Sequence, residues 1–146
     1  MGFLGRFADP AYVLLRAAAG LLFMFHGLQK TFGVLNGFQP PFGTQLWLGG
    51  IIELVCGALI ALGLFTRYAA FLASGTMAVA YLQFHWKLQL GEGFFPSVNK
   101  GEAALVYAFL FLHVACAGGG RYALDALLRR PAPALATPSD RAPRSA

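Results

Sequence analysis

Long apolar runs, separated by short polar or Gly- and Pro-rich stretches, dominate the chain. Four of them approach the roughly 20 residues that a helix needs to cross a bilayer. They are residues 11–32, 46–65, 68–86 and 102–117. Because the hydrocarbon offers the backbone no water, each run is predicted to be a helix. The pattern therefore predicts an all-α fold, an integral membrane four-helix bundle.

A shorter amphipathic pattern follows the fourth run. After the glycines of "GGG", the stretch 121–130 places Arg121, Asp125 and Arg129 on one face and leucines on the other. This pattern predicts a short C-terminal interfacial helix on the membrane surface. We therefore expect one transmembrane domain over residues 1–130. Residues 131–146 are rich in Pro and Ala and are predicted to be a disordered tail.

Composition supports the membrane class. Of the 146 residues, 58% are hydrophobic and 12% are charged, whereas a soluble domain has about 25% charged residues. The first run is longer than the apolar part of a secretory signal, and no small-residue cleavage site follows it. Asp9 and Pro10 instead predict a helix start, with Asp9 as the cap. The net charge of +5 forms no basic patch interleaved with aromatics, so we expect no nucleic-acid partner.

Lys and Arg positions predict the orientation of these helices. Four spans place both termini on one side of the membrane, together with the short turn that contains Arg67. Seven arginines then fall on that side and three lysines on the other, at Lys30, Lys87 and Lys100. The N- and C-termini are therefore predicted to be cytoplasmic, in a multi-pass arrangement.

Polar side chains gather at the outward ends of the first two runs. The segment "LLFMFHGLQK" ends in His26, Gln29 and Lys30. With a rise of ~1.5 Å per residue, His26 lies roughly 9 Å below the outer boundary and Glu53 about 10 Å below it. A charge in lipid is costly unless it faces the protein interior or a wet cavity. We therefore expect an outward-facing polar pocket in which Glu53 contacts His26 or Lys30.

The spacing of small residues supports this contact. One seam of the first run follows a 4-3-4-3 pattern through Arg16, Gly20, Phe23, Gly27 and Lys30. In the second run, Gly49, Glu53 and Gly57 share a face. Glycines allow helix backbones to approach closely in membranes. The seam that carries Lys30 is therefore expected to pack on the face that carries Glu53.

Other polar residues add to the pocket or have simpler interpretations. His85, Asn99 and Glu102 lie at the outward ends of the third and fourth runs. The simpler interpretations are an interfacial aromatic belt for His85 and a helix-capping pair for Asn99 and Glu102. Lys30 alone would anchor a helix end. Three further residues are expected to have structural roles, by snorkelling or by hydrogen bonds across the bundle: Arg16, Arg67 and His113.

Catalytic and metal-binding patterns are absent from the sequence. It contains no nucleotide-binding, zinc-binding or nucleophile-elbow motif. The histidines are spread over three runs and different depths, and Cys56 and Cys116 have no metal-site spacing. The prediction is that the chain holds no metal, and that the two cysteines are packing residues without a disulfide.

Several segments together resemble the DoxX family over about residues 11–128. They are "RAAAGLLFMFHGLQKTFG", "GGIIELVCGALIALGLFTRYAA", the histidine of "YLQFHW", "FFPSVNKGEAALVYAFLFL" and "GGGRYALDALL". The resemblance implies a four-helix protein of the bacterial inner membrane. It also implies a link to redox systems such as thiosulfate:quinone oxidoreductase and membrane thiol-stress complexes. The residues that match the family's polar positions are His26, Lys30, Glu53, Arg67, His85, Asn99 and Glu102.

Two functional hypotheses follow. In the first, the chain is a membrane subunit linked to an oxidoreductase or to thiol and sulfur redox chemistry. Its outward pocket would bind a quinone or another small molecule, and it would need a redox partner subunit, because the chain has no recognisable electron carrier. In the second, it is a non-catalytic membrane scaffold or small-molecule-binding protein. Both hypotheses leave open whether the chain is itself an enzyme, and both are compatible with a homo-oligomer in the bilayer.

Overall fold

The computed structural model describes residues 2–128, and within this range the chain forms helices and no strands. The all-α class predicted from the apolar runs is therefore confirmed. The predicted tail, residues 131–146, lies outside the described residues. The helices are η1 (Phe3–Phe7), α1 (Ala8–Phe32), α2 (Gln45–Leu62), α3 (Thr66–Ala80), η2 (Tyr81–Trp86), η3 (Glu92–Phe94), α4 (Pro96–Asn99), α5 (Glu102–Ala117) and α6 (Leu124–Leu128).

The helix ends follow local residue chemistry. Both α1 and α2 end at a glycine in the left-handed region, Gly33 with φ +66° and Gly63 with φ +73°, where a side chain would be strained. The hydroxyl of Thr44 caps α2 by accepting a hydrogen bond from the backbone N–H of Trp47 at 3.2 Å. The predicted cap at Asp9 is wrong. Because η1 runs directly into α1, Asp9 lies within the first turn, and the helix has no side-chain cap.

Two helical stretches of the described part are long and apolar enough to cross a membrane. These are Phe3–Phe32, which joins η1 to α1, and Gln45–Leu62. α5 is apolar but has only 16 residues. α3 continues without a break into η2, whose hydrogen bonding is that of a π-helix. Large apolar side chains are exposed along these helices, as expected where lipid replaces water as the solvent.

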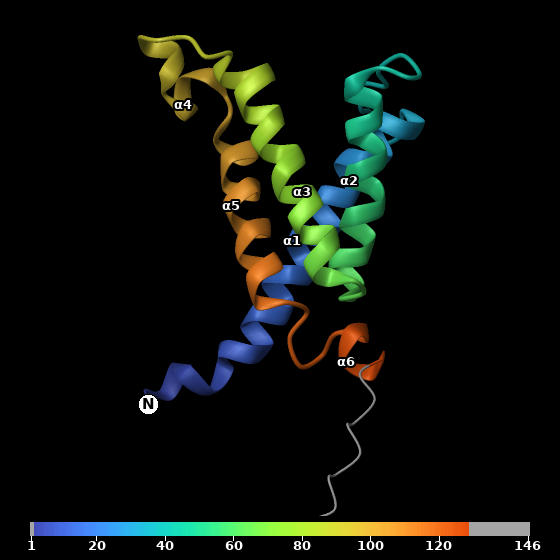
Figure 1. Cartoon of the computed structure of the whole chain (residues 1–146), viewed down its shortest axis with the longest axis vertical. Coiled ribbons are helices and arrows are strands. Elements are labelled where there is room, and N and C mark those ends of the chain that lie inside the picture. The colour runs from blue at the N-terminus through green and yellow to red at the C-terminus, as the bar shows by residue number, and fades with distance from the viewer. Residues whose placement is uncertain (1, 129–146) are drawn as a thin grey trace, which may run out of the picture.

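The long helices are arranged as two pairs. α1 packs mainly on α2, and α3 packs mainly on α5. α2 and α3 lie close at the turn that joins them and separate towards their other ends (Figure 1). The very short connection between the second and third apolar runs led us to expect that α2 and α3 would be tight antiparallel neighbours. The expectation holds only near the turn, because a short turn fixes the separation of two helices at one end only.

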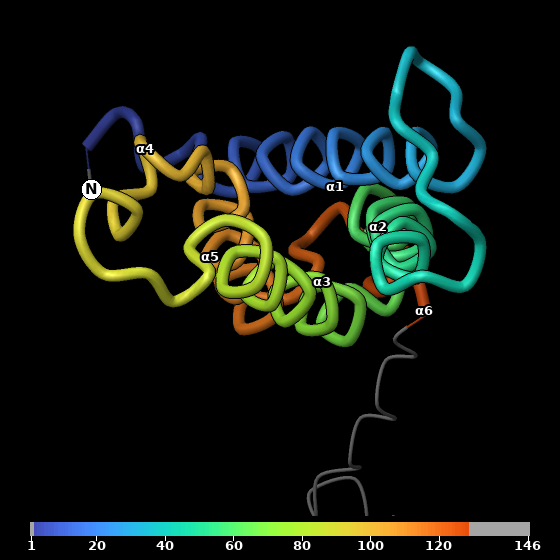
Figure 2. The backbone as a smooth tube through the Cα atoms, turned by 90° about the horizontal axis from the view of Figure 1, so that it is seen from above, coloured from blue at the N-terminus to red at the C-terminus, as the bar shows by residue number. Residues whose placement is uncertain are grey.

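The molecule has two distinct ends. The turn end contains the α2–α3 turn (residues 63–65), the N-terminus and α6. The loop end contains the connections 33–44 and 87–101 (Figure 1). Seen along the long axis, α1 lies along one side of the molecule, and α3 and α5 lie on the other (Figure 2). α6 covers the turn between α2 and α3, with its backbone N–H at Asp125 bonded to the carbonyl of Gly63 at 2.9 Å.

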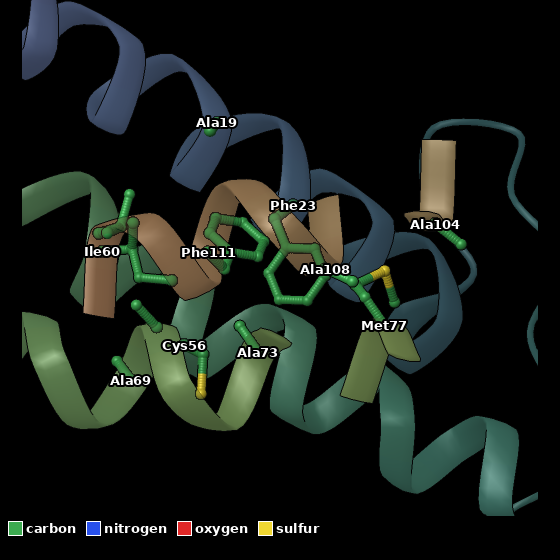
Figure 3. Close-up of a cluster of buried hydrophobic side chains, with 12 residues drawn as sticks. Ala19, Phe23, Cys56, Ile60, Ala69, Ala73, Met77, Ala104, Ala108 and Phe111 are labelled. Carbon is green, nitrogen blue, oxygen red and sulfur yellow. The ribbon is translucent and has the colours of Figure 1, made fainter. Parts of the chain in front are cut away.

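An aromatic core joins the two pairs where they cross. The ring of Phe23 on α1 lies 4.8 Å, centroid to centroid, from that of Phe111 on α5 (Figure 3). Tyr107 stacks on Phe111 at 5.4 Å. Ring pairs of this kind contribute about 0.5–1.5 kcal/mol each beyond the burial of their surface. Elsewhere the core is built largely from alanine, so the helices are held close together.

Candidate functional site

The α1–α2 interface determines where the polar groups of the site lie. The backbones of α1 and α2 are in direct contact there. A Cβ atom added to Gly27 would lie 2.2 Å from the backbone nitrogen of Leu54, and one added to Gly57 would lie 2.5 Å from that of Met24. The predicted seam on α1 is therefore confirmed. On α2 the expectation was partly wrong, because Gly50 rather than Gly49 faces α1, next to the Cβ of Lys30.

A buried ion pair lies at the loop-end part of this seam. Nζ of Lys30 is 2.5 Å from Oε1 of Glu53. The Glu53 side chain is 3% exposed and that of Lys30 is 32% exposed, so the cation reaches out of the protein while the carboxylate does not. The other carboxylate oxygen, Oε2, is buried and has no hydrogen-bond partner in the described part of the chain. The expected contact between Glu53 and a basic residue is therefore present, and it involves Lys30.

A cavity of about 390 Å³ opens beside the ion pair, in the space where α2 and α3 separate. Lys30 and Glu53 are its charged groups, and most of its walls are apolar. The remaining lining residues come from α2, α3 and η2: Gln45, Leu46, Leu48, Gly49, Ile52, Phe71, Leu72, Gly75, Thr76, Met77, Val79, Ala80 and Phe84. Its volume falls within the range of roughly 300–1,000 Å³ that is typical of small-molecule sites. We call this space the α2–α3 cavity.

His26 and Gln29 lie outside the α2–α3 cavity. His26 is exposed on the outer face of α1, so the expectation that it faces Glu53 is wrong. Gln29 is half-buried, and its amide donates to the carbonyl oxygen of Leu35 at 3.3 Å. Its side chain packs against Gly37, and a Cβ atom added to Gly37 would lie 2.2 Å from the Cβ of Gln29. Gln29 therefore holds the loop that follows α1.

His85 and Asn99 form a separate polar group on the other helix pair. Nδ1 of His85 lies 3.3 Å from the carbonyl oxygen of Asn99. The Asn99 amide donates to the carbonyl of Gly93 at 3.0 Å, and its Oδ1 accepts from the N–H of Gly101 at 2.8 Å. These bonds hold the chain between η2 and α5. The sequence predicted a single polar pocket. The structure instead has two separate polar groups, Lys30 with Glu53 between α1 and α2, and His85 with Asn99 between η2 and α5.

Glu102 is exposed at the first residue of α5. The helix-capping interpretation of Asn99 and Glu102 is also wrong, because the cap position is Gly101 and no side chain caps the helix. The reason is local. α4 ends at Asn99, and Lys100 has a φ of +58°, so the chain reverses before α5 begins. Glu102 therefore places a negative charge at the positive end of the α5 dipole.

A contact that the sequence did not predict joins α2 to η2 beside the cavity. The amide of Gln45, at the start of α2, donates to Oε1 of Gln83 in η2 at 2.5 Å. Gln45 also lines the cavity. η2 is the π-helical continuation of α3, and π-helical turns often occur at functional sites. This bond joins the two helix pairs at the loop end, where they are otherwise apart.

Polar residues at the turn end satisfy the ends of helices. Arg16, 2% exposed, donates to the carbonyls of Ile60 and Ala61 at the end of α2. Arg67 donates to the carbonyl of Cys116 at the end of α5 at 2.7 Å. Cations stabilise the negative end of a helix dipole.

The same end contains two contacts of Tyr12. Its hydroxyl donates to the carbonyl of Gly118 at 2.5 Å. Its ring meets the edge of His113 at a centroid distance of 6.1 Å. His113 was expected to form a hydrogen bond across the bundle, and it instead lies exposed beside this ring. Asp125, for which the sequence pattern predicted a surface helix, binds the start of α3 through both carboxylate oxygens.

Metal-ligating side chains do not cluster in residues 2–128, where no three His, Cys, Asp or Glu groups come together. Cys56 is buried and Cys116 is exposed, and both are free thiols.

The sequence model of the DoxX family matches residues 11–86. The chain belongs to the DoxX family. Two relatives have similar lengths. A Haemophilus influenzae protein, described as uncharacterized, is 40% identical over 117 residues, or 76% of this chain and 85% of the relative. An uncharacterized membrane protein of Mycobacterium tuberculosis is 30% identical over 139 residues, or 86% of this chain and 85% of the relative. No solved structure gives a significant match.

The DoxX match includes the whole candidate site. All residues that line the α2–α3 cavity lie between Lys30 and Phe84, inside the matched range of 11–86. The membrane nature predicted from composition agrees with the family and with the description of the mycobacterial relative. The segment from η3 to α6 lies beyond the DoxX match.

Proposed function

We propose that this DoxX protein is a multi-pass protein of the bacterial inner membrane that binds a small apolar molecule of the quinone class in the α2–α3 cavity. We further propose that it acts as a membrane subunit of an oxidoreductase or of a thiol and sulfur redox system. The observation that supports this function is the Lys30–Glu53 ion pair, which lies at one part of an otherwise apolar cavity. Sites for apolar cofactors combine such walls with a few convergent polar groups.

The ion pair is suited to hold a polar ring. The ammonium of Lys30 has three N–H donors, and Glu53 occupies one of them. A second N–H is therefore able to bond to a carbonyl oxygen of a bound ring. The hydrophobic tail of such a molecule would pass along Leu48, Phe71 and Val79, which line the cavity and are exposed on the outer surface of the helices. In a membrane this surface meets lipid, so an apolar ligand reaches the site without crossing water.

A second candidate function is a non-catalytic scaffold. The contacts of Arg16, Arg67 and Asp125 favour it, because each of these charged groups satisfies the backbone at a helix end. These contacts favour a structural role for the charged residues at the turn end, as the sequence predicted for Arg16 and Arg67. The Lys30–Glu53 pair differs from them, because it borders a cavity and leaves one carboxylate oxygen without a partner.

Mass spectrometry of small molecules that co-purify in mild detergent tests the proposal. Gly75 lines the cavity and has no atom within 4 Å of an added Cβ, so Gly75→Phe fills the cavity without a backbone clash. Ala78→Phe adds the same side chain at an exposed position of α3 and is the matched control. We expect a quinone in the wild type and in the control, and its loss in Gly75→Phe. Equal amounts in all three, or no quinone in any, would refute the proposed function.

A further inference from the structure

Oε2 of Glu53 has no hydrogen-bond donor within residues 2–128, and this indicates which chemical group a bound molecule would supply. Carboxylate oxygens accept hydrogen bonds, and nearly all buried acceptors in proteins have a donor. Oε1 of Glu53 accepts from Lys30, whereas Oε2 is buried and accepts from no group in residues 2–128. The side chain is 3% exposed. Glu53 also lines the α2–α3 cavity, so a molecule bound in that cavity is placed to supply the missing donor.

The side chains that line the cavity supply few hydrogen-bond donors. Apart from Lys30, the side chains with hydrogen-bonding groups there are Gln45 and Thr76. The hydroxyl of Thr76 donates to the carbonyl of Leu72 at 2.9 Å, on its own helix. The amide of Gln45 donates to Oε1 of Gln83 in η2. The remaining lining residues are apolar or glycine.

The geometry points to a ligand that has an apolar body and a hydroxyl group, with the hydroxyl donating a hydrogen bond to Oε2 of Glu53. This inference rests on the proposed function, because it requires that the cavity is a binding site. It adds the chemical class of the ligand. For a molecule that exists as a carbonyl and a hydroxyl form, such as a quinone and its hydroquinone, the hydroxyl form gains this bond and the carbonyl form does not. The site therefore favours the reduced form.

A pair of probes that differ only in the donor tests the inference. para-Decylphenol carries a hydroxyl, and its methyl ether has the same apolar body without the donor. Binding of each to the purified full-length protein is measured by titration in native mass spectrometry. A hydrogen bond to a charged oxygen predicts that the phenol binds about tenfold to a hundredfold more tightly than the ether. Tetradecanol is a third probe, which carries the hydroxyl of a lipid alcohol. Tighter binding of the phenol than of tetradecanol would indicate a ring hydroxyl, and the reverse would indicate a lipid alcohol.

Two variants locate the effect. Glu53→Gln replaces one of the two carboxylate oxygens with an amide nitrogen. The preference for the phenol over the ether should therefore fall to about threefold or less. Gly75→Phe fills the cavity and leaves the ion pair, so it should abolish binding of both probes even if Glu53→Gln folds poorly. The Ala78→Phe control should retain wild-type affinities.

The outcomes separate the inference from the function beneath it. Equal affinity for the phenol and the ether, both lost in Gly75→Phe, would refute the hydroxyl class and leave the cavity as a binding site. Binding of neither probe would refute both. A preference for the phenol that persists unchanged in Gly75→Phe would show that the hydroxyl binds elsewhere, and would also refute the inference.

Discussion

Asp125 caps the start of α3 at Thr66, a residue 59 positions earlier in the chain. One carboxylate oxygen accepts hydrogen bonds from the Thr66 backbone N–H at 2.9 Å and from its hydroxyl at 2.7 Å. The other oxygen accepts from the N–H of Phe65 at 2.7 Å. Thr66 is fully buried, so the cap that is normally supplied by a neighbouring residue comes here from α6. α6 is therefore part of the folded helical domain.

Replacing Asp125 with Ala should lower stability. It removes the cap of α3 and leaves buried N–H groups without a partner, at a cost of about 1–2 kcal/mol. We expect the thermal midpoint in detergent to fall by several degrees. Asp9→Ala is the control. The Asp9 side chain is 61% exposed and its carboxylate lies 3.8 Å from the guanidinium of Arg121, and exposed ion pairs of this kind contribute little to stability. Equal midpoints for the two variants would contradict the capping role.

Arg16→Met should destabilise the α2 end. The guanidinium supplies donors to the carbonyls of Ile60 and Ala61, and hydrogen bonds from a charged group are worth about 1.5–3 kcal/mol. We expect a comparable loss in the free energy of unfolding, measured by denaturant titration. Arg6→Met, at an exposed position, should stay near wild type. If Arg16 only reached to lipid headgroups, the two variants would behave alike.

The α1–α2 seam should reject even a methyl group at Gly27. An added Cβ would lie 2.2 Å from a backbone nitrogen of α2, so the helices must separate, at a cost of about 1–3 kcal/mol. Lys30 would then move away from Glu53. We expect Gly27→Ala to lower both the thermal midpoint and ligand content. Gly49→Ala, which meets nothing within 4 Å, should leave the thermal midpoint near that of the wild type. A stable Gly27→Ala protein would disprove the close approach.

The Lys30–Glu53 pair allows structural and functional roles to be separated. Lys30→Met alone leaves a buried carboxylate without its cation and should cost about 2 kcal/mol, less than a fully buried pair because Lys30 is partly exposed. The double variant Lys30→Met and Glu53→Leu removes both charges and should recover most of that stability. Its ligand content, measured by mass spectrometry, should stay low. Recovery of ligand together with stability would show that the pair serves folding only.

Topology reporters test the orientation. Arg67 and Arg121 lie at the turn end and Lys87 and Lys100 at the loop end, and positive residues are retained in the cytoplasm. A reporter fused after residue 130 should be active only in its cytoplasmic form. One inserted at the connection between η2 and η3 should be active only in its periplasmic form. The opposite pair of activities would place the α2–α3 cavity on the cytoplasmic side.

Helices and the α1 seam could be predicted from spacing because both depend on local periodicity. The 4-3-4-3 pattern indicated which face of α1 packs, and the residues on that face, such as Arg16 and Phe23, are almost fully buried. The error at His26 has the same physical origin. Depth depends on the rise per residue, whereas the direction of a side chain depends on rotation by about 100° per residue. His26 matches Glu53 in depth, but it is adjacent in sequence to Gly27 and thus points away from the seam.

The apolar walls of the cavity, unlike the contact between Lys30 and Glu53, could not be predicted from the sequence. The cavity exists because α2 and α3 diverge, and that divergence depends on how α3 packs on α5 and α2 on α1. Asp125 is a similar case. Its own helix has five residues, and its partners lie in a turn distant in the sequence. Contacts of this kind are fixed by the tertiary arrangement, and no local pattern encodes them.

The glycines of this chain divide into two kinds with different evolutionary freedom. Gly20, Gly27 and Gly57 hold backbones in contact, and any side chain there would disrupt the fold. Gly49 and Gly75 line the cavity and have open space around them. Substitutions at these two positions would change the shape of the α2–α3 cavity at little cost to the helices around it. The shape of the α2–α3 cavity is thus able to change while the close packing of α1 on α2 stays constant.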